Sequence, residues 1–466
     1  MRIRRTEMPL GARPSAIGWL LAAELVCLVG ATLSLLAGRD DLTLVLLVAP
    51  LNIIVWIAFA DDSYKFLVFL AALLPLASLE LLPRAYAQFV LYPGVVLSVS
   101  FLRLARPRSE AAGSSGLLRS ERTPLLVLSI CVVLAALNAT VHGWARTHVL
   151  FYSVLSLEVS AVVYFFAVVP QTLLQVRQVI FLMACTLLLT FVSMFFLPAA
   201  VGEGGALGGK VVVTPFGTAN LNAYATVVAS VAAMVLGLFV GSRRIRVRAA
   251  LAVACVLLIA ALLLTKSRGA WLGFGLASLY IVISYRSFRL TLAAAAVVLL
   301  LLSVESLRHV MLARFRETTA SDPSLLGRVL LWHYALKVAK ANWLLGVGME
   351  NFSMVRNSYG YPIPMAIARQ YNAHNLYLEF AADLGIVGLG SFLWLLVGTV
   401  KRLHRWAQAS VSENRGVALG LAAGIIAYAT HGLLDAVIWQ HGAYMLLAVM
   451  LGLAMCVRRL CSSGGG

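Results

Sequence analysis

Long uninterrupted apolar stretches, separated by short polar segments, make up most of this chain. A helix needs roughly 20 apolar residues to cross a bilayer, whereas transmembrane strands are about half as long and alternate in polarity. The stretches therefore exclude a transmembrane sheet and predict an all-α polytopic integral membrane protein. About 12–14 transmembrane helices are expected, depending on whether the shorter stretches are re-entrant. The predicted spans are 16–37, 42–60, 66–82, 89–105, 123–141, 151–170, 179–198, 218–241, 249–265, 270–285, 290–305, 384–400, 416–435 and 441–457.

One long polar segment, 306–374, interrupts this pattern. It contains a helical pattern that begins at Gly327, and it ends at His374-Asn375. We therefore expect a single membrane domain, 1–466, with a helical loop subdomain over 306–383.

The composition agrees with a membrane protein, since 61% of the residues are hydrophobic, 12% are charged and the mean hydropathy is +0.91. A soluble globular chain is far more polar. The net charge is +18, but most basic residues lie in short loops between predicted spans, so no nucleic-acid partner is expected. The six cysteines form no CxxC pair and have no metal-type spacing, so neither a disulfide framework nor a zinc site is predicted.

The distribution of Lys and Arg predicts the orientation. With a cytoplasmic N-terminus, the inner segments hold 23 of the 37 basic residues, the short outer loops hold 6, and the other 8 lie in the long polar segment. Short cytoplasmic loops are enriched in Lys and Arg. Both termini are therefore expected in the cytoplasm and the long loop outside, where its basic residues suit a phosphate-bearing lipid.

His374 is the first candidate for chemistry. A helical interpretation aligns it with Leu378 and Gly385, at the top of the span that begins near residue 384. A histidine can accept a proton near neutral pH, as the activation of a hydroxyl group requires. Asn375 and Glu379 could fix the imidazole tautomer or contact sugar hydroxyls. The alternative is a helix-capping or interfacial histidine.

Basic residues near His374 are candidates for binding a phosphate. Lys266 and Arg268 lie on a short outer loop, and Arg328 begins a helix expected on the membrane surface. Arginine presents a planar fork suited to phosphate, although both residue types also reach toward lipid headgroups at span ends. Lys210 and Asn220 could add donors from the glycine-rich loop 199–217 and the start of the next span, as could Asn222, and Arg356 could support the glycan.

Acidic residues give a different signal. Glu24, Glu80 and Glu158 are candidates because they fall within predicted spans, as are His431 and Asp435 near an outer span end. No paired-carboxylate metal signature lies on the outer side, so we expect chemistry without a metal or other cofactor.

Several motifs together resemble the O-antigen ligase/polymerase family. They are SRGA from Ser267, GR-x3-W from Gly327, LLGVG-x-x-NF from Leu344, and His-Asn at His374 with a His-x10-Gly spacing to Gly385. The resemblance covers about 200–390. The family also has an arginine shortly before its Asn-rich span start, whereas this chain has VVVTPFGTANLN, with Lys210 as the nearest cation.

The resemblance implies a glycosyltransferase of the bacterial inner membrane with a periplasmic active site. Such an enzyme moves an O-antigen polysaccharide from undecaprenyl diphosphate to a sugar hydroxyl of lipid A-core, in lipopolysaccharide biosynthesis. His374 would act as the base, while Arg268, Arg328, Lys266 and Lys210 would bind the donor diphosphate. A direct, metal-independent displacement would invert the anomeric carbon.

Three alternatives remain open at the level of sequence. A polymerase that joins repeat units on the same carrier shares the donor and the topology. Enzymes that transfer glycans to protein are a further variant. A transporter without chemistry is expected to have inverted repeats and charges along a path through the membrane, whereas here the cations gather on one face beside a histidine.

Overall fold

Helices dominate the computed structural model, which describes residues 64–65, 67–68, 71, 79–80, 119–144, 146–196, 211–214, 217–286, 323–359, 372–436 and 441–463. In chain order the helices are α5 (Arg119–Val141), α6 (Arg146–Val168), α7 (Leu173–Phe196), α8 (Leu221–Gly241), α9 (Ile245–Leu264), α10 (Arg268–Tyr285), α13 (Pro323–Ala341), α14 (Phe352–Val355), the 3-10 helix η2 (Arg356–Tyr359), α16 (Leu376–Ala409), α17 (Ser412–His431) and α18 (His441–Ser463).

Six of the described helices are long and apolar enough to cross a membrane. The all-α polytopic prediction is thus confirmed. The predicted spans 16–37, 42–60, 89–105 and 290–305 lie outside the described residues. The membrane-length segments are Thr123–Val141, Leu173–Val192, Leu221–Gly241, Ile245–Leu264, Leu376–Ala409 and Gly442–Cys461.

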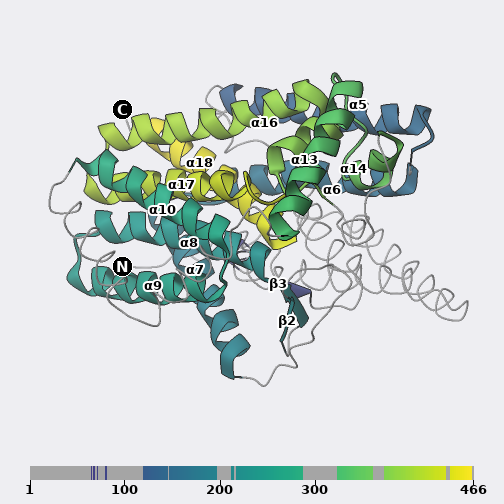
Figure 1. The fold of residues 1–466 in the computed structure, drawn as a ribbon. Helices are drawn as coiled ribbons and strands as arrows, with labels where there is room; N and C mark the ends of the chain where they lie inside the picture. The colour runs from purple at the N-terminus through teal and green to yellow at the C-terminus, as the bar shows by residue number, and fades with distance from the viewer. Residues whose placement is uncertain are drawn as a thin grey trace, which may run out of the picture.

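Helix α8 is the most deeply buried of these segments, with 83% of its span inside the protein. It packs closely against α17, where Gly237 meets Gly416 and Gly420. A Cβ on any of the three glycines would overlap the backbone of the facing helix. Small residues allow such close approach between helices in a membrane. In Figure 1 the axes of α8, α9, α10, α16 and α17 are roughly aligned, whatever the direction of the chain, and the axis of α13 lies at a steep angle to them.

Three short strands form a small sheet that the sequence did not predict. β2 (Val211–Thr214) and β3 (Gly217–Asn220) pair antiparallel, with Val211 opposite Asn220, and β1 (Leu79–Glu80) pairs with the other edge of β3. Strand β3 leads directly into α8 (Leu221–Gly241).

Helix α16 breaks at Gly385, whose φ of 67° and ψ of −171° are not helical. Glycine adopts positive φ at little cost, and a Cβ here would overlap the backbone of Leu344. The prediction of one helical stripe from His374 to Gly385 is wrong, because the helix begins only at Leu376 and is interrupted at the glycine.

The break is filled by residues 342–352, the crossing segment, which follows α13. Ile386 N donates to Trp343 O at 2.7 Å, and Val347 N donates to Ala382 O at 3.0 Å. These bonds pair the amide and the carbonyl that a continuous helix would have joined to each other, so the break leaves neither group unsatisfied. The first part of α16, 376–384, is therefore stabilised by hydrogen bonds to the crossing segment as well as by its own helical hydrogen bonds.

Glu350, in the crossing segment, gives a pH-dependent prediction. Burial raises the pKa of Glu350 to about 8; a hydrogen bond from Tyr152 lowers it and the charge of Glu379 raises it further. A raised folded-state pKa adds stability that is complete below about pH 4 and is lost as the pH rises through about 8. Glu350→Gln stays neutral at every pH. The Tm of this variant minus the Tm of wild type should therefore be larger at pH 9 than at pH 5.

Glu413→Gln is the matched control. The hydrogen bond from Arg177, at 2.7 Å, lowers the pKa of Glu413. Glu413 is therefore ionised at both pH values, and the difference between its variant and wild type should stay constant. A Tm difference for Glu350→Gln that is equally independent of pH would contradict the buried, protonated carboxyl.

Candidate active site

His374 lies in a turn just before α16, with a left-handed φ of 48°. This conformation is uncommon for residues other than glycine and persists where surrounding contacts hold it. Here Ala373 N donates to Glu379 Oε2 at 2.5 Å, and His374 N donates to Asn372 Oδ1 at 3.1 Å. Asn375 caps α16, with its Oδ1 accepting from two backbone N–H groups at 3.0 Å. Side chains of the turn and of α16 therefore fix the backbone at His374.

The His374 turn docks against the turn that follows α17, residues 432–436. Leu376 N donates to Gly432 O at 2.7 Å, and Asn375 Nδ2 donates to Leu433 O at 3.0 Å. This docking brings His374 Nδ1 to 2.8 Å from Asp435 Oδ1. Two segments about sixty residues apart in the chain thus form a histidine–carboxylate pair.

Asp435 is buried but well supplied with hydrogen-bond donors. Its Oδ2 accepts from Asn222 Nδ2 at 2.8 Å, and its Oδ1 also accepts from Ala436 N at 2.9 Å. Burial alone would raise the pKa of Asp435, but the neighbouring His374, Arg328 and His431 together lower it well below its usual range. The carboxylate is therefore ionised and accepts a hydrogen bond from Nδ1–H of His374.

This contact determines how His374 can react. With Nδ1–H donated to Asp435, the other ring nitrogen, Nε2, carries the lone pair. The His374 side chain is 23% exposed, while that of Asp435 is 8% exposed. A polar group of a substrate can therefore reach the histidine, which can accept its proton while the carboxylate stabilises the resulting imidazolium.

A second histidine, His431, ties the same region to α8 and α10. Its Nδ1 lies 2.5 Å from Thr226 Oγ1 and its Nε2 lies 3.4 Å from Ser267 Oγ. Gly269 packs directly on the imidazole ring, because a Cβ there would lie 2.5 Å from its Cδ2. The SRGA motif therefore includes a serine and a glycine that fit against His431, with Arg268 between them.

Two of the predicted arginines lie close to residues of this region. Arg268 is the first residue of α10, beside Ser267, which meets His431. Arg328 lies on α13, close enough to lower the pKa of Asp435. Lys266 is exposed in the same turn as Ser267 and has a left-handed φ of 55°. Arg328 therefore brings positive charge near Asp435, and Arg268 is adjacent to a residue that contacts His431.

Other predicted residues have different positions. Lys210 lies outside the described residues, and Asn220 is the last residue of β3, next to α8. Arg356 is only 3% exposed and lies within electrostatic range of Glu379, which is fully buried. Glu379 accepts from the backbone N–H of Ala373, and Asn375 caps α16. The imidazole is instead contacted by Asp435.

Asp435 and His431 had only a weak signal in the sequence. Both were candidates as ionisable residues near an outer span end, but nothing in their spacing linked them to His374. Asn222 was noted as a possible donor, whereas the role of Thr226 was missed because a threonine inside an apolar helix has no distinctive pattern. Among the described residues, no group of three or more His, Cys, Asp or Glu side chains could hold a metal ion.

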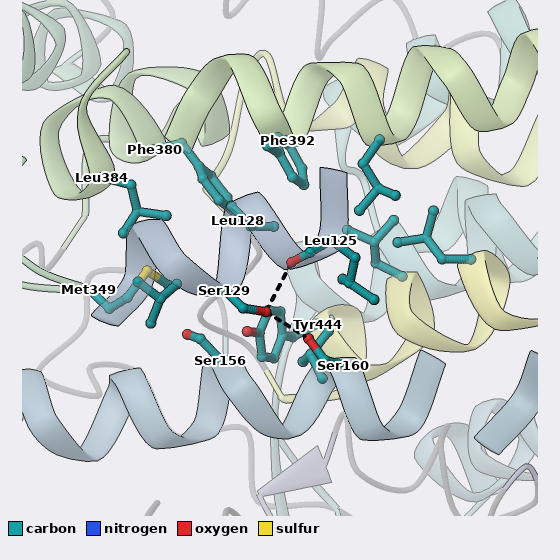
Figure 2. A pocket seen from close by; sticks show the side chains of 15 residues that line it. Leu125, Leu128, Ser129, Ser156, Ser160, Met349, Phe380, Leu384, Phe392 and Tyr444 are labelled. Atoms are coloured by element: carbon teal, nitrogen blue, oxygen red, sulfur yellow. Dashed lines mark hydrogen bonds between the residues drawn. The ribbon is translucent and has the colours of Figure 1, made fainter. Parts of the chain in front are cut away.

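A small cavity beneath the first part of α16 is separate from these residues (Figure 2). Its volume is about 40 Å³, room for about three water molecules. Apolar side chains, including Phe380 and Leu384, line most of it, while Ser129 and Ser160 form a hydroxyl pair 3.2 Å apart on one wall. The cavity is too small for a sugar or a lipid chain, so it is not the substrate site.

A comparison with known families matches one part of the chain. Residues 253–393 match the family model described as O-Antigen ligase, which confirms the resemblance found in the sequence motifs and supports an O-antigen ligase family for this chain. Arg268, Arg328 and His374 lie inside the matched range, whereas Asp435 and His431 lie beyond it. No curated protein matches the chain.

The match supports a function of O-antigen ligase or polymerase type. Proteins of this family are glycosyltransferase-like membrane enzymes, and the family implies lipid-linked polysaccharide substrates and contact with membrane lipids. Together with the six membrane-length helices, the match supports a multi-pass membrane protein.

The contact between Gly269 and His431 gives a testable prediction. Gly269→Ala adds a methyl group against the imidazole, and overpacking of this kind costs about 1–3 kcal/mol. We expect a lower Tm than wild type, because the start of α10 must shift to admit the methyl group. Gly275→Ala is the control on the same helix, since a Cβ there meets nothing within 4 Å. An equal Tm for the two variants would contradict the packing.

Proposed function

We propose that this protein is an O-antigen ligase, which transfers a polysaccharide from undecaprenyl diphosphate to a sugar hydroxyl of lipid A-core. The observation that carries the proposal is the His374–Asp435 pair at 2.8 Å, with Arg328 in electrostatic range of the same carboxylate. A base and a phosphate-binding cation side by side suit glycan transfer from a lipid diphosphate.

The proposed reaction is a direct displacement. The acceptor hydroxyl gives its proton to Nε2 of His374 as its oxygen attacks the anomeric carbon. A new glycosidic C–O bond forms, and the bond from the anomeric carbon to the phosphate oxygen breaks, with its electron pair leaving on undecaprenyl diphosphate. Attack from the face opposite the leaving group inverts the anomeric carbon. Asp435 stabilises the imidazolium that forms on His374.

The leaving group determines the role of the arginines. A diphosphate needs no general acid, but its negative charge grows in the transition state. Arg268 and Arg328 are proposed to meet that charge, each contributing about 3 kcal/mol by analogy with single oxyanion donors. Lys266 and Lys210 would add to the positive field. No metal or other cofactor takes part in this scheme.

The proposed orientation has the site on the periplasmic face of the bacterial inner membrane, with both termini in the cytoplasm. The charge distribution supports it, because the ends of the described helices away from His374 are rich in basic residues. These include Arg177, Arg243, Arg244, Arg246, Arg248, Arg286, Lys401, Arg405 and Arg415.

The direct test is transfer in vitro, with purified protein, an undecaprenyl diphosphate-linked polysaccharide and lipid A-core. Ligase activity predicts that the glycan appears on lipid A-core. Transfer onto a second lipid-linked repeat unit would instead make the protein a polymerase. Absence of transfer to either acceptor would contradict both, and would favour transport without chemistry.

The base is tested by two conservative variants. His374→Gln keeps a hydrogen-bonding side chain but cannot accept the proton, and Asp435→Asn removes the charge that stabilises the imidazolium. We expect each to lower kcat by about 10²–10⁴-fold while the protein stays folded in the membrane. His333→Gln, at an exposed histidine of α13, is the matched control and should retain wild-type activity. Activity of His374→Gln within a few-fold of wild type would rule out the general base.

A further inference from the structure

Asp383 lies at the end of the first part of α16, about two helical turns from His374, and is only 1% exposed. Its Oδ2 accepts from Glu350 N at 2.7 Å, and its Oδ1 accepts from Phe352 N at 3.0 Å. Both donors are backbone groups of the crossing segment. One buried carboxylate thus binds two amides of a different part of the chain.

Backbone contacts beside Asp383 join the same two segments. Gly348 N donates to Asp383 O at 2.9 Å. Gly346 is packed so tightly that a Cβ would overlap the backbone of Asp383 and Leu384. Asn138 Nδ2, from α5, donates to Gly346 O at 2.8 Å and so fixes the crossing segment from its other side. The position of the crossing segment along α16 is therefore closely defined.

The crossing segment joins α13 to the first part of α16. At the ends of these helices away from the crossing segment lie two residues of the proposed site, Arg328 on α13 and His374 just before α16. Arg328 lies in the second turn of α13, and α13 leads directly into the crossing segment. His374 immediately precedes the cap of α16. Between these ends the helices pack through one buried cluster, which includes Leu331 and Ala335 of α13 and Ala382 of α16.

We propose that Asp383 is a positioning residue, which sets Arg328 and His374 in register by fixing the crossing segment against the first part of α16. It touches neither the donor nor the acceptor. The inference rests on the proposed transferase function, since it concerns the geometry of that site.

The chemistry of the side chain explains why a carboxylate suits this place. Two backbone N–H groups converge on it, and each of the two side-chain oxygens accepts from one of them. Asparagine has one acceptor oxygen and would direct an NH₂ group at the other amide. Alanine leaves both amides without this partner. A shift of about 1 Å between catalytic groups can cost about 10²-fold in rate, so a remote contact of this kind is visible in kcat.

The experiment compares Asp383→Asn and Asp383→Ala with Ser391→Ala. Ser391 lies on α16 beyond the break and donates to Pro124 O at 2.7 Å, so its variant removes a buried contact of the same helix that does not involve the crossing segment. We measure kcat for transfer, Kd for the undecaprenyl diphosphate-linked donor, and Tm. We expect kcat to fall by about 10-fold in Asp383→Asn and about 10²-fold in Asp383→Ala, with donor Kd within about threefold of wild type. Ser391→Ala should keep its kcat.

Two results would overturn the proposal: kcat of Asp383→Asn within about threefold of wild type, or a loss of kcat in Ser391→Ala equal to that in Asp383→Asn at similar Tm. Hydrogen exchange at the Glu350 and Phe352 amides gives an independent test, because it needs no transfer activity. Protection in wild type and its loss in Asp383→Asn support the contact, whereas equal exchange in both overturns it. If wild type lacks transfer activity but shows this protection, the proposed function fails and the contact stands.

Discussion

The hydrogen bond between His374 and Asp435 depends on two turns that dock through their backbones, and the rest of the candidate site is arranged around that docking. The 432–436 turn supplies carbonyls to the His374 turn, while Asp435 also bonds Asn222 of α8. His431, the last residue of α17, meets Ser267 beside Arg268. The end of α17 and the turn after it therefore contact both His374 and the start of α10 at Ser267. A change at this end of α17 should affect both regions.

The break in α16 allows a second segment of the chain to support the part of the helix that follows His374. The break at Gly385 admits the crossing segment, whose amides and carbonyls replace the lost helical bonds. The buried carboxylates Glu379 and Asp383 then bind backbone amides at the two ends of 376–384. Backbone pairing of this kind is how a membrane protein accommodates an interrupted helix.

The sequence predicted the helical class, and its motifs indicated the family that the match over residues 253–393 supports. Residue type alone made His374 and Arg268 candidates for the site. Asp435 could not be linked to His374, because their contact depends on two turns meeting across about sixty residues, which no local pattern encodes. Gly385 was assigned to a continuous stripe, since helical periodicity takes no account of a crossing segment. Arg356 was expected near the glycan because it is charged, yet it is buried in range of Glu379.

The central claim is that His374 and Asp435 act as one unit, and a double-mutant cycle on transfer kinetics tests it most directly. Rates are measured for His374→Ala, Asp435→Ala and the double variant, with the same donor and lipid A-core acceptor. If the carboxylate acts only through the histidine, Asp435→Ala should cause little further loss once His374 is gone. Losses that multiply independently in the double variant would show that the two residues act separately and would contradict this account.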